Sequence, residues 1–311
     1  MGRSRPLKVA FVHGRRWAID HDNKVTAVMG AIQTAFAHAG TDADLAALDV
    51  HVIDYSSLLD GMAQQRHAQI AADRHRQMVI PQFPVATLRD PRVELGHHAV
   101  ACMCCARGGV VTEAWHGVAK VAASVDSIVH LTQMKLSDVE TYVDDEHARS
   151  AVHDFVASEA ESIRPDVVIA HSLGTIVTLD WLGTADEDVQ PAALITMGSP
   201  IAVPEFQKTA IPQSTLDWMA NPQSAWLNLW DPTDEVCGAR GIEDSHLRHA
   251  IAAIANLRVN NHPGRVIADP HSVLAYLTHH PVGRWLASLA HPTHELDPRS
   301  AQQSLVAALG G

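Results

Sequence analysis

The chain of 311 residues is long enough to bury a large core, either as one α/β domain or as a domain with an insertion. Its hydrophobic fraction of 47% is typical of a soluble globular protein. The formal net charge of −12 argues against a nucleic-acid binder, which usually carries a basic surface, and against steady attachment to anionic lipid.

The first part of the chain predicts two strands with a helix between them. An apolar run at 8–12 predicts a strand, and apolar residues at helical spacing over 25–36 predict a helix that ends before Gly40. A second strand is expected at 50–53. This alternation is typical of a parallel sheet.

The regular alternation is lost between residues 57 and 139. A polar helical pattern, several prolines and another apolar helical stripe follow one another there. We therefore predict a helical cap or lid insertion at 57–139, with a core made of residues 1–56 and 140–311. Such an insertion resembles a cap or lid, which would shape a pocket. The alternative is that its helices only cover the sheet.

The middle of the chain carries the clearest local motif. A helix is expected over 144–163, and the apolar run at 167–170 predicts a buried strand. Ser172 follows at once, flanked two positions away by the small residues Ala170 and Gly174, and a helical pattern begins after it. A serine at the tip of such a turn needs small neighbours, because bulk would collide across the strained backbone.

This stretch resembles the nucleophile elbow of the α/β-hydrolase superfamily. Ala170 stands where glycine is usual, as in the Ala-His-Ser-x-Gly version found in some small bacterial lipases. The resemblance covers residues 6–60 and 140–290. It implies the α/β-hydrolase fold and a serine esterase or lipase-like activity.

Further strands are expected at 192–197, 226–230 and 265–267. The Gly-Ser-Pro that follows the first of these resembles lipase and esterase members of the superfamily, and Ser199 within it is interpreted as a turn residue, not as a second nucleophile. The whole pattern predicts an α/β fold with a mostly parallel central sheet and helices on both faces. Functional residues should then lie at the carboxyl ends of the strands.

A serine hydroxyl needs an adjacent base, and the base needs an acid that fixes its orientation. The superfamily's chain order is serine, acid, histidine, and this sequence offers Ser172, Asp234 and His271, each just beyond a predicted strand. These three are the predicted catalytic residues.

Other residues compete for two of these roles. Asp231 directly follows a predicted strand and is the alternative acid, although the superfamily usually places its acid two or three residues later, where Asp234 lies. His271 is favoured as the base because it follows the last predicted strand. The competing histidines are His262, His279 and His280. His171, next to the serine, is expected to pack or to line the pocket.

The resemblance also implies an oxyanion hole. The backbone N–H of Leu173 would provide one donor, and that of Gly14 or Arg15, in the loop after the first strand, would provide the other. The alternative for the His13-Gly14 pair is an ordinary glycine turn.

The predicted reaction is cleavage of an ester through an acyl-enzyme. Ser172 would attack the carbonyl, His271 would move the proton, and Asp234 would orient His271. The expected partner is a small-molecule ester or acyl substrate with an apolar acyl group. No cofactor is expected, because the sequence has neither a phosphate-cradling glycine loop nor a dinucleotide fingerprint, and no metal is expected either.

Two alternatives stay open. The same triad would serve an acyltransferase, an amidase or a peptidase, because the choice of acceptor and of scissile bond depends on the pocket. A non-catalytic ligand-binding protein could also retain the fold, although such members often lose one residue of the triad.

The sequence also bears on compartment. The first residues lack an apolar stretch of the secretory type, and no run of about 18 apolar residues predicts a membrane-spanning helix. Cys102, Cys104 and Cys105 are crowded together and Cys237 stands apart, which is poor geometry for a disulfide framework, so we expect a reduced, cytoplasmic protein. The crowded cysteines are interpreted as small buried residues. A soft metal or redox site is the less favoured alternative, because no second ligand pair follows at zinc-like spacing.

Overall fold

The structure is a computed structural model, and all of its described helices and strands belong to one unit formed by residues 1–63 and 137–311. The described residues are 5–13, 21–59, 61–62, 65, 142–202, 215, 217–218, 225–237, 240–244, 254–261, 270–290 and 296–310. Nearly all of the predicted insertion at 57–139 lies outside these ranges, as do the predicted strand at 265–267 and the cysteines at 102, 104 and 105.

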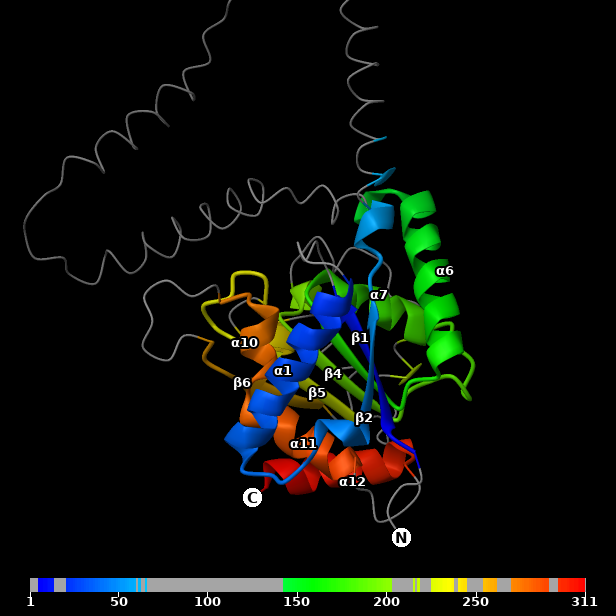
Figure 1. The fold of residues 1–311 in the computed structure, drawn as a ribbon. Helices are drawn as coiled ribbons and strands as arrows, with labels where there is room; N and C mark the ends of the chain where they lie inside the picture. The colour runs from blue at the N-terminus through cyan, green and yellow to red at the C-terminus, as the bar shows by residue number, and fades with distance from the viewer. Residues whose placement is uncertain are drawn as a thin grey trace, which may run out of the picture. The chain divides into compact units, whose positions relative to one another are not determined.

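A parallel sheet of six strands forms the centre of the unit (Figure 1). Its strands pair in the order β2-β1-β3-β4-β5-β6, and every pairing is parallel. The α/β class and the parallel sheet are therefore confirmed. The strands are β1 (Leu7–His13), β2 (Leu48–Ile53), β3 (Val167–His171), β4 (Ala193–Met197), β5 (Ala225–Trp230) and β6 (Ile254–Arg258).

The central strands are apolar along their whole length because both of their faces are covered. Every residue of β3, β4 and β5 is buried. Strands buried on both faces read as continuous apolar runs, which is why their positions were predictable from the sequence.

The sequence prediction missed β6. Its residues, Ile-Ala-Asn-Leu-Arg, are mostly half-buried, and the strand pairs only with β5 among the described strands. A strand at the end of a sheet needs fewer apolar residues, so its pattern is weaker.

Helices cover both faces of the sheet (Figure 1). The helices α1, α10, α11 and α12 share a core with side chains such as Phe11 and Ile169, whereas α6 and α7 share the other core with Ala10 and Val168. Alternate residues of one strand thus serve opposite faces. The helices are α1 (His21–Ala39), α6 (Glu146–Ile163), α7 (Leu173–Leu182), α10 (Val273–Leu277), α11 (His280–Ala290) and α12 (Pro298–Leu309), and the 3-10 turns are η1 (Leu45–Ala47), η2 (Pro200–Ala202) and η3 (Gly241–Asp244).

The order of the strands creates a switch point between β1 and β3. The chain leaves β1 toward β2 on one side, and it later continues from β3 toward β4 on the other side. The connections that follow two such strands diverge, which leaves a crevice at their carboxyl ends where ligands bind in open α/β sheets. Ser172 follows β3 at this position.

In the part of the chain that the structure describes, no helix has both the length and the apolar character needed to cross a membrane.

Candidate active site

Ser172 occupies a strained turn between β3 and α7. Its backbone has φ 56° and ψ −132°, a conformation that residues other than glycine rarely adopt. The turn is held on both sides, because the Ser172 N–H donates to the Met197 carbonyl and the Ser172 carbonyl accepts from the Thr175 N–H and hydroxyl. The side chain is thereby projected from the carboxyl edge of the sheet, and Ser172 remains partly exposed.

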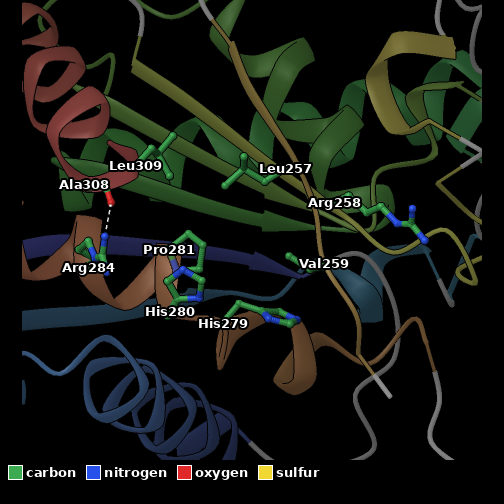
Figure 2. A pocket seen from close by; sticks show the side chains of 9 residues that line it. All are labelled: Leu257, Arg258, Val259, His279, His280, Pro281, Arg284, Ala308 and Leu309. Carbon is green, nitrogen blue, oxygen red and sulfur yellow. Dashed lines mark hydrogen bonds between the residues drawn. The ribbon is translucent and has the colours of Figure 1, made fainter. Parts of the chain in front are cut away.

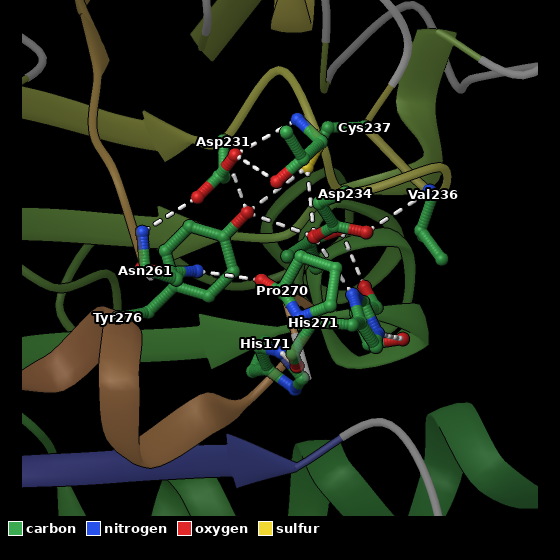
Figure 3. Close-up of polar contacts among 12 residues, drawn as sticks. His171, Asp231, Asp234, Val236, Cys237, Asn261, Pro270, His271 and Tyr276 are labelled. Atoms are coloured by element: carbon green, nitrogen blue, oxygen red, sulfur yellow. Dashed lines mark hydrogen bonds and ion pairs between the residues drawn. The ribbon is translucent and has the colours of Figure 1, made fainter. Parts of the chain in front are cut away.

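Three of the predicted site residues, Ser172, His271 and Asp234, meet at this edge. Figure 3 shows His271 beside Asp234. The Ser172 Oγ lies 2.9 Å from His271 Nε2, and His271 Nδ1 lies 2.9 Å from Asp234 Oδ2. A carboxylate only accepts hydrogen bonds, so Nδ1 carries the proton and Nε2 is free to accept from the serine. A hydroxyl, an imidazole and a carboxylate in this order can generate a serine nucleophile.

The Asp234 carboxylate is buried, with only 1% of its side chain exposed. Burial alone would raise the pKa of Asp234, but hydrogen bonds from His271, Tyr276 and Cys237 together hold that pKa below its ordinary value. The Val236 N–H donates to the other carboxylate oxygen at 3.0 Å. Asp234 is therefore ionised and fixed in orientation.

His271 is placed by its own segment of backbone. The Asn261 side-chain amide donates to the Pro270 carbonyl at 2.6 Å, immediately before the histidine. Ser272, immediately after it, caps the start of α10 by accepting from the Ala275 N–H. The imidazole thus extends from a short loop that is anchored on both sides.

His171 supports the same loop from β3. Its Nε2–H donates to the His271 carbonyl at 3.0 Å, and the two rings lie 4.6 Å apart. His13, the neighbour of His171 across the β1–β3 pair, stacks on the His171 ring with the ring centroids 5.7 Å apart. Complete burial lowers the pKa of His171 well below its ordinary value, and the nearby His271 and His13 rings lower it further. His171 is therefore a neutral spacer that packs against His271.

Gly198 at the end of β4 permits this packing. Its φ is +57°, and a Cβ there would lie 3.1 Å from His271 Nδ1 and 3.2 Å from His171 Nε2. A larger residue would combine backbone strain with displacement of the two rings. Gly198, the glycine of the Gly-Ser-Pro segment, thus lets the His171 and His271 rings lie close to the backbone at the end of β4.

The competing residues have other partners. Asp231 accepts hydrogen bonds from the Thr233 N–H and hydroxyl and from the Asn261 N–H, so it organises the turn and the loop beside it. His279 is bonded to the Asn261 side chain at 2.9 Å. Ser199 Oγ lies 2.8 Å from the Thr175 hydroxyl, in keeping with a turn role.

The predicted oxyanion-hole residues are described only in part. Leu173 is the first residue of α7, where a backbone N–H has no acceptor within the helix and the helix dipole is positive. Gly14 and Arg15 lie outside the described residues, as does the competing His262.

Compared with family models, with curated proteins and with solved structures, the chain has no match in any of the three. The chemistry of the site is therefore inferred from its own contacts.

Sequence reasoning missed several side chains that hold the acid. Tyr276 donates to Asp234 Oδ2 at 2.8 Å and Cys237 does so at 3.2 Å. Asn261 connects Asp231 to the loop of His271, because its backbone N–H donates to Asp231 and its side chain donates to the Pro270 carbonyl. The spacing of Tyr276, five residues after the predicted base and within an apolar helical pattern, was the one available signal. A contact across 42 positions of sequence leaves no local pattern.

Of two cavities in the described part of the structure, one is lined by residues such as Leu257, Pro281 and Leu309 (Figure 2). It has a volume of about 440 Å³ and lies between the end of β6, the start of α11 and the end of α12. The second, of about 320 Å³, lies beside β2 and the end of α6. Neither is lined by Ser172, Asp234 or His271. Within the described ranges, no group of three or more histidine, cysteine or acidic residues is arranged to hold a metal ion.

Proposed function

We propose that this protein is a serine hydrolase that cleaves ester bonds through an acyl-enzyme intermediate. The observation that carries the proposal is the hydrogen-bonded series from Ser172 Oγ to His271 and on to Asp234, with both contacts at 2.9 Å. Support comes from the strained backbone of Ser172, since strain at such a turn is typical of functional positions.

In the proposed reaction, Ser172 Oγ attacks the ester carbonyl while His271 Nε2 takes its proton. The tetrahedral intermediate collapses when His271 returns that proton to the departing alkoxide, which leaves as an alcohol and leaves an acyl group on Ser172. Water then attacks the acyl-enzyme with His271 again as the base, and the acid product and free Ser172 are formed. Asp234 stabilises the imidazolium throughout and keeps its own charge.

The negative charge that develops on the carbonyl oxygen needs fixed donors. The N–H of Leu173 is one proposed donor, because it opens α7 beside the serine and is reinforced by the helix dipole. The second proposed donor is the N–H of Gly14 or Arg15, in the connection that follows β1 across the switch point.

The proposal includes the α/β-hydrolase fold for the core and a cap formed by residues 57–139. What supports the fold is the strand-turn-helix context of Ser172 within a parallel sheet covered on both faces. The proposed substrate is a small-molecule ester, and a series of acyl lengths tests whether an apolar acyl group is preferred.

Hydrolysis of p-nitrophenyl esters of increasing acyl length tests this function. We expect wild type to hydrolyse them, Ser172→Ala and His271→Ala to lose activity, and Asp234→Asn to lose about 10⁴-fold in kcat because the imidazole loses its orienting partner. Ser199→Ala is the matched control, since this serine lies at the same edge but bonds to Thr175 of α7 and to the Ile201 N–H, and not to His271 or Asp234.

The control should retain kcat within a few-fold of wild type. Hydrolysis that persists unchanged in Ser172→Ala, or a cooperatively folded wild type that hydrolyses no ester of the series, would contradict the proposal.

A further inference from the structure

Tyr276 joins the segment that carries His271 to the loop that carries Asp234 (Figure 3). It lies on α10, which begins two residues after His271, and its side chain is fully buried. Its hydroxyl donates to Asp234 Oδ2 at 2.8 Å and accepts from the Asp231 N–H at 3.0 Å.

The direction of the Tyr276 hydroxyl proton is fixed by these two partners. A backbone N–H can only donate, so the phenol oxygen is the acceptor toward Asp231. The single phenolic proton is then available for Asp234. Burial raises the pKa of Tyr276 far above its ordinary value, and the nearby Cys237 and Asp234 raise it further, so this proton is retained.

Asp234 Oδ2 therefore receives two side-chain N–H or O–H bonds below 3 Å, one from His271 Nδ1 at 2.9 Å and one from Tyr276 at 2.8 Å. The weaker thiol donor Cys237 lies 3.2 Å from the same oxygen and 3.3 Å from the phenol oxygen. The oxygen that faces the imidazole is thus the one that the phenol holds.

We propose that Tyr276 is a positioning residue that acts through Asp234: its hydroxyl holds Oδ2 against His271 Nδ1 and keeps the carboxylate charged. This inference rests on the proposed hydrolase function. Tyr276 touches neither Ser172 Oγ nor the position where a substrate would react, so its effect on catalysis passes through the acid.

The titratable groups around this pair come from three parts of the site. They are Asp231, Asp234 and Cys237 of the loop after β5, His271 before α10, and His171 at the end of β3, whose ring lies 6.1 Å from that of Tyr276. Among the side chains that lower the pKa of Asp234, Tyr276 follows His271 and precedes Cys237. Removal of the phenol should therefore raise the pKa of Asp234.

The chain offers a matched control for a buried phenol that bonds a carboxylate. Tyr142 is also fully buried, and its hydroxyl donates to Asp180 Oδ2 at 2.6 Å. It belongs to the core on the α6–α7 face, whereas Tyr276 belongs to the core on the opposite face. Tyr142→Phe thus removes the same kind of bond without touching Asp234.

The decisive measurement is a carbon-13 NMR titration of the aspartate carboxyl groups, with the Asp234 signal assigned by Asp234→Asn. In Tyr276→Phe we expect Asp234 to titrate at a higher pH than in wild type, kcat to fall about tenfold and KM to stay within about twofold. In Tyr142→Phe the Asp234 titration and kcat should match wild type. In an Asp234→Asn background, Tyr276→Phe should cost much less in kcat, because Tyr276 is proposed to act through a carboxylate charge that asparagine lacks.

An Asp234 titration that is the same in Tyr276→Phe and wild type would overturn the inference, whether or not the enzyme is active. A shifted titration in a protein that hydrolyses no ester would support the positioning contact while removing the proposed function. Should Tyr276→Phe fail to fold, 3-fluorotyrosine at position 276 keeps the ring and makes the hydroxyl a stronger donor. It should then move the Asp234 titration to lower pH, and an unmoved titration would overturn the inference equally.

Discussion

His171 is a buried histidine beside two other histidine rings. Only 4% of it is exposed, its ring contacts those of His13 and His271, and its Nε2–H donates to the His271 carbonyl. Its Nδ1 is buried and has no hydrogen-bond partner in the described structure. A second positive charge beside His271 would oppose the imidazolium that the proposed mechanism requires, so a neutral His171 suits the site.

This environment makes the stability of the fold depend on pH. The pKa of His171 is lowered in the folded protein, so only the unfolded chain takes up this proton as the pH falls below about 6.5. The free energy of unfolding should therefore decrease with falling pH until the lowered folded pKa is reached. Urea unfolding between about pH 7.5 and about pH 5.5 should show a smaller decrease in His171→Gln than in wild type.

His147→Gln removes a histidine from the exposed surface of α6 and is the control for this comparison. If His171→Gln and His147→Gln change the pH dependence equally, the buried neutral state of His171 is refuted.

Asp231 and Asp234 are two buried acids with different hydrogen-bond partners, and only Asp234 has the proposed catalytic role. Asp231 is 1% exposed and accepts from Thr233 and from the Asn261 N–H, whereas Asp234 is bonded to His271. We expect Asp231→Asn to lower the melting temperature and to leave kcat largely unchanged. We expect Asp234→Asn to lower kcat by about 10⁴-fold. Thermal melts and ester kinetics on the same preparations would check this, and a larger loss of kcat in Asp231→Asn would reverse the assignment.

At the scale of elements, α1 and α11 pack so closely that only a glycine fits at position 283 of α11. A Cβ on Gly283 of α11 would lie 2.2 Å from the Ala35 carbonyl oxygen of α1. The backbone of α1 cannot yield as a flexible side chain would, so the helices would have to separate.

Gly283→Ala should therefore destabilise the protein by about 3 kcal/mol or more. Gly30→Ala, on an exposed position of α1 with no atom within 4 Å of the added Cβ, should stabilise it by about 1 kcal/mol through helix propensity. Urea unfolding gives the free energy of unfolding of both variants. An equal change in that free energy in the two variants would contradict the close contact of α1 with α11.

Several elements were predictable because their patterns are local. The helix expected over 144–163 is α6, which begins after its N-cap Asp145 and ends at Ile163 before Arg164 in the left-handed region. The strand at 167–170 and the turn at Ser172 were likewise encoded by an apolar run and small neighbours. The strand β6 was not predictable in this way, because an edge position relaxes the apolar pattern that a central strand requires.

At the scale of the whole molecule, the strand order brings distant residues together. Ser172 directly follows β3 and Asp234 lies shortly after β5, and parallel strands place these two ends at one edge of the sheet. His271 meets them there from the segment before α10. The set of three could be predicted from chain order and strand ends. The bond from Tyr276 to Asp234 could not, because it depends on how α10 is seated against the loop after β5.

The same topology predicts which strands unfold last. The strands β3 and β4 are wholly buried and pair on both sides, whereas β6 is partly exposed and pairs with β5. We expect backbone amides of β3 and β4 to exchange with deuterium most slowly, at rates set by global unfolding, and those of β6 to exchange much faster. Hydrogen exchange followed by mass spectrometry checks this, and slow exchange in β6 equal to that in β3 would contradict the sheet order.

The most direct test of the proposed active site is reaction of the purified protein with a fluorophosphonate probe, followed by peptide mapping of the modified residue. The hydrogen-bonded series at Ser172 predicts one label on Ser172, no label in Ser172→Ala and strongly slowed labelling in His271→Ala. A cooperatively folded wild type that takes up no probe, or a label that persists in Ser172→Ala, would contradict an activated serine at this turn.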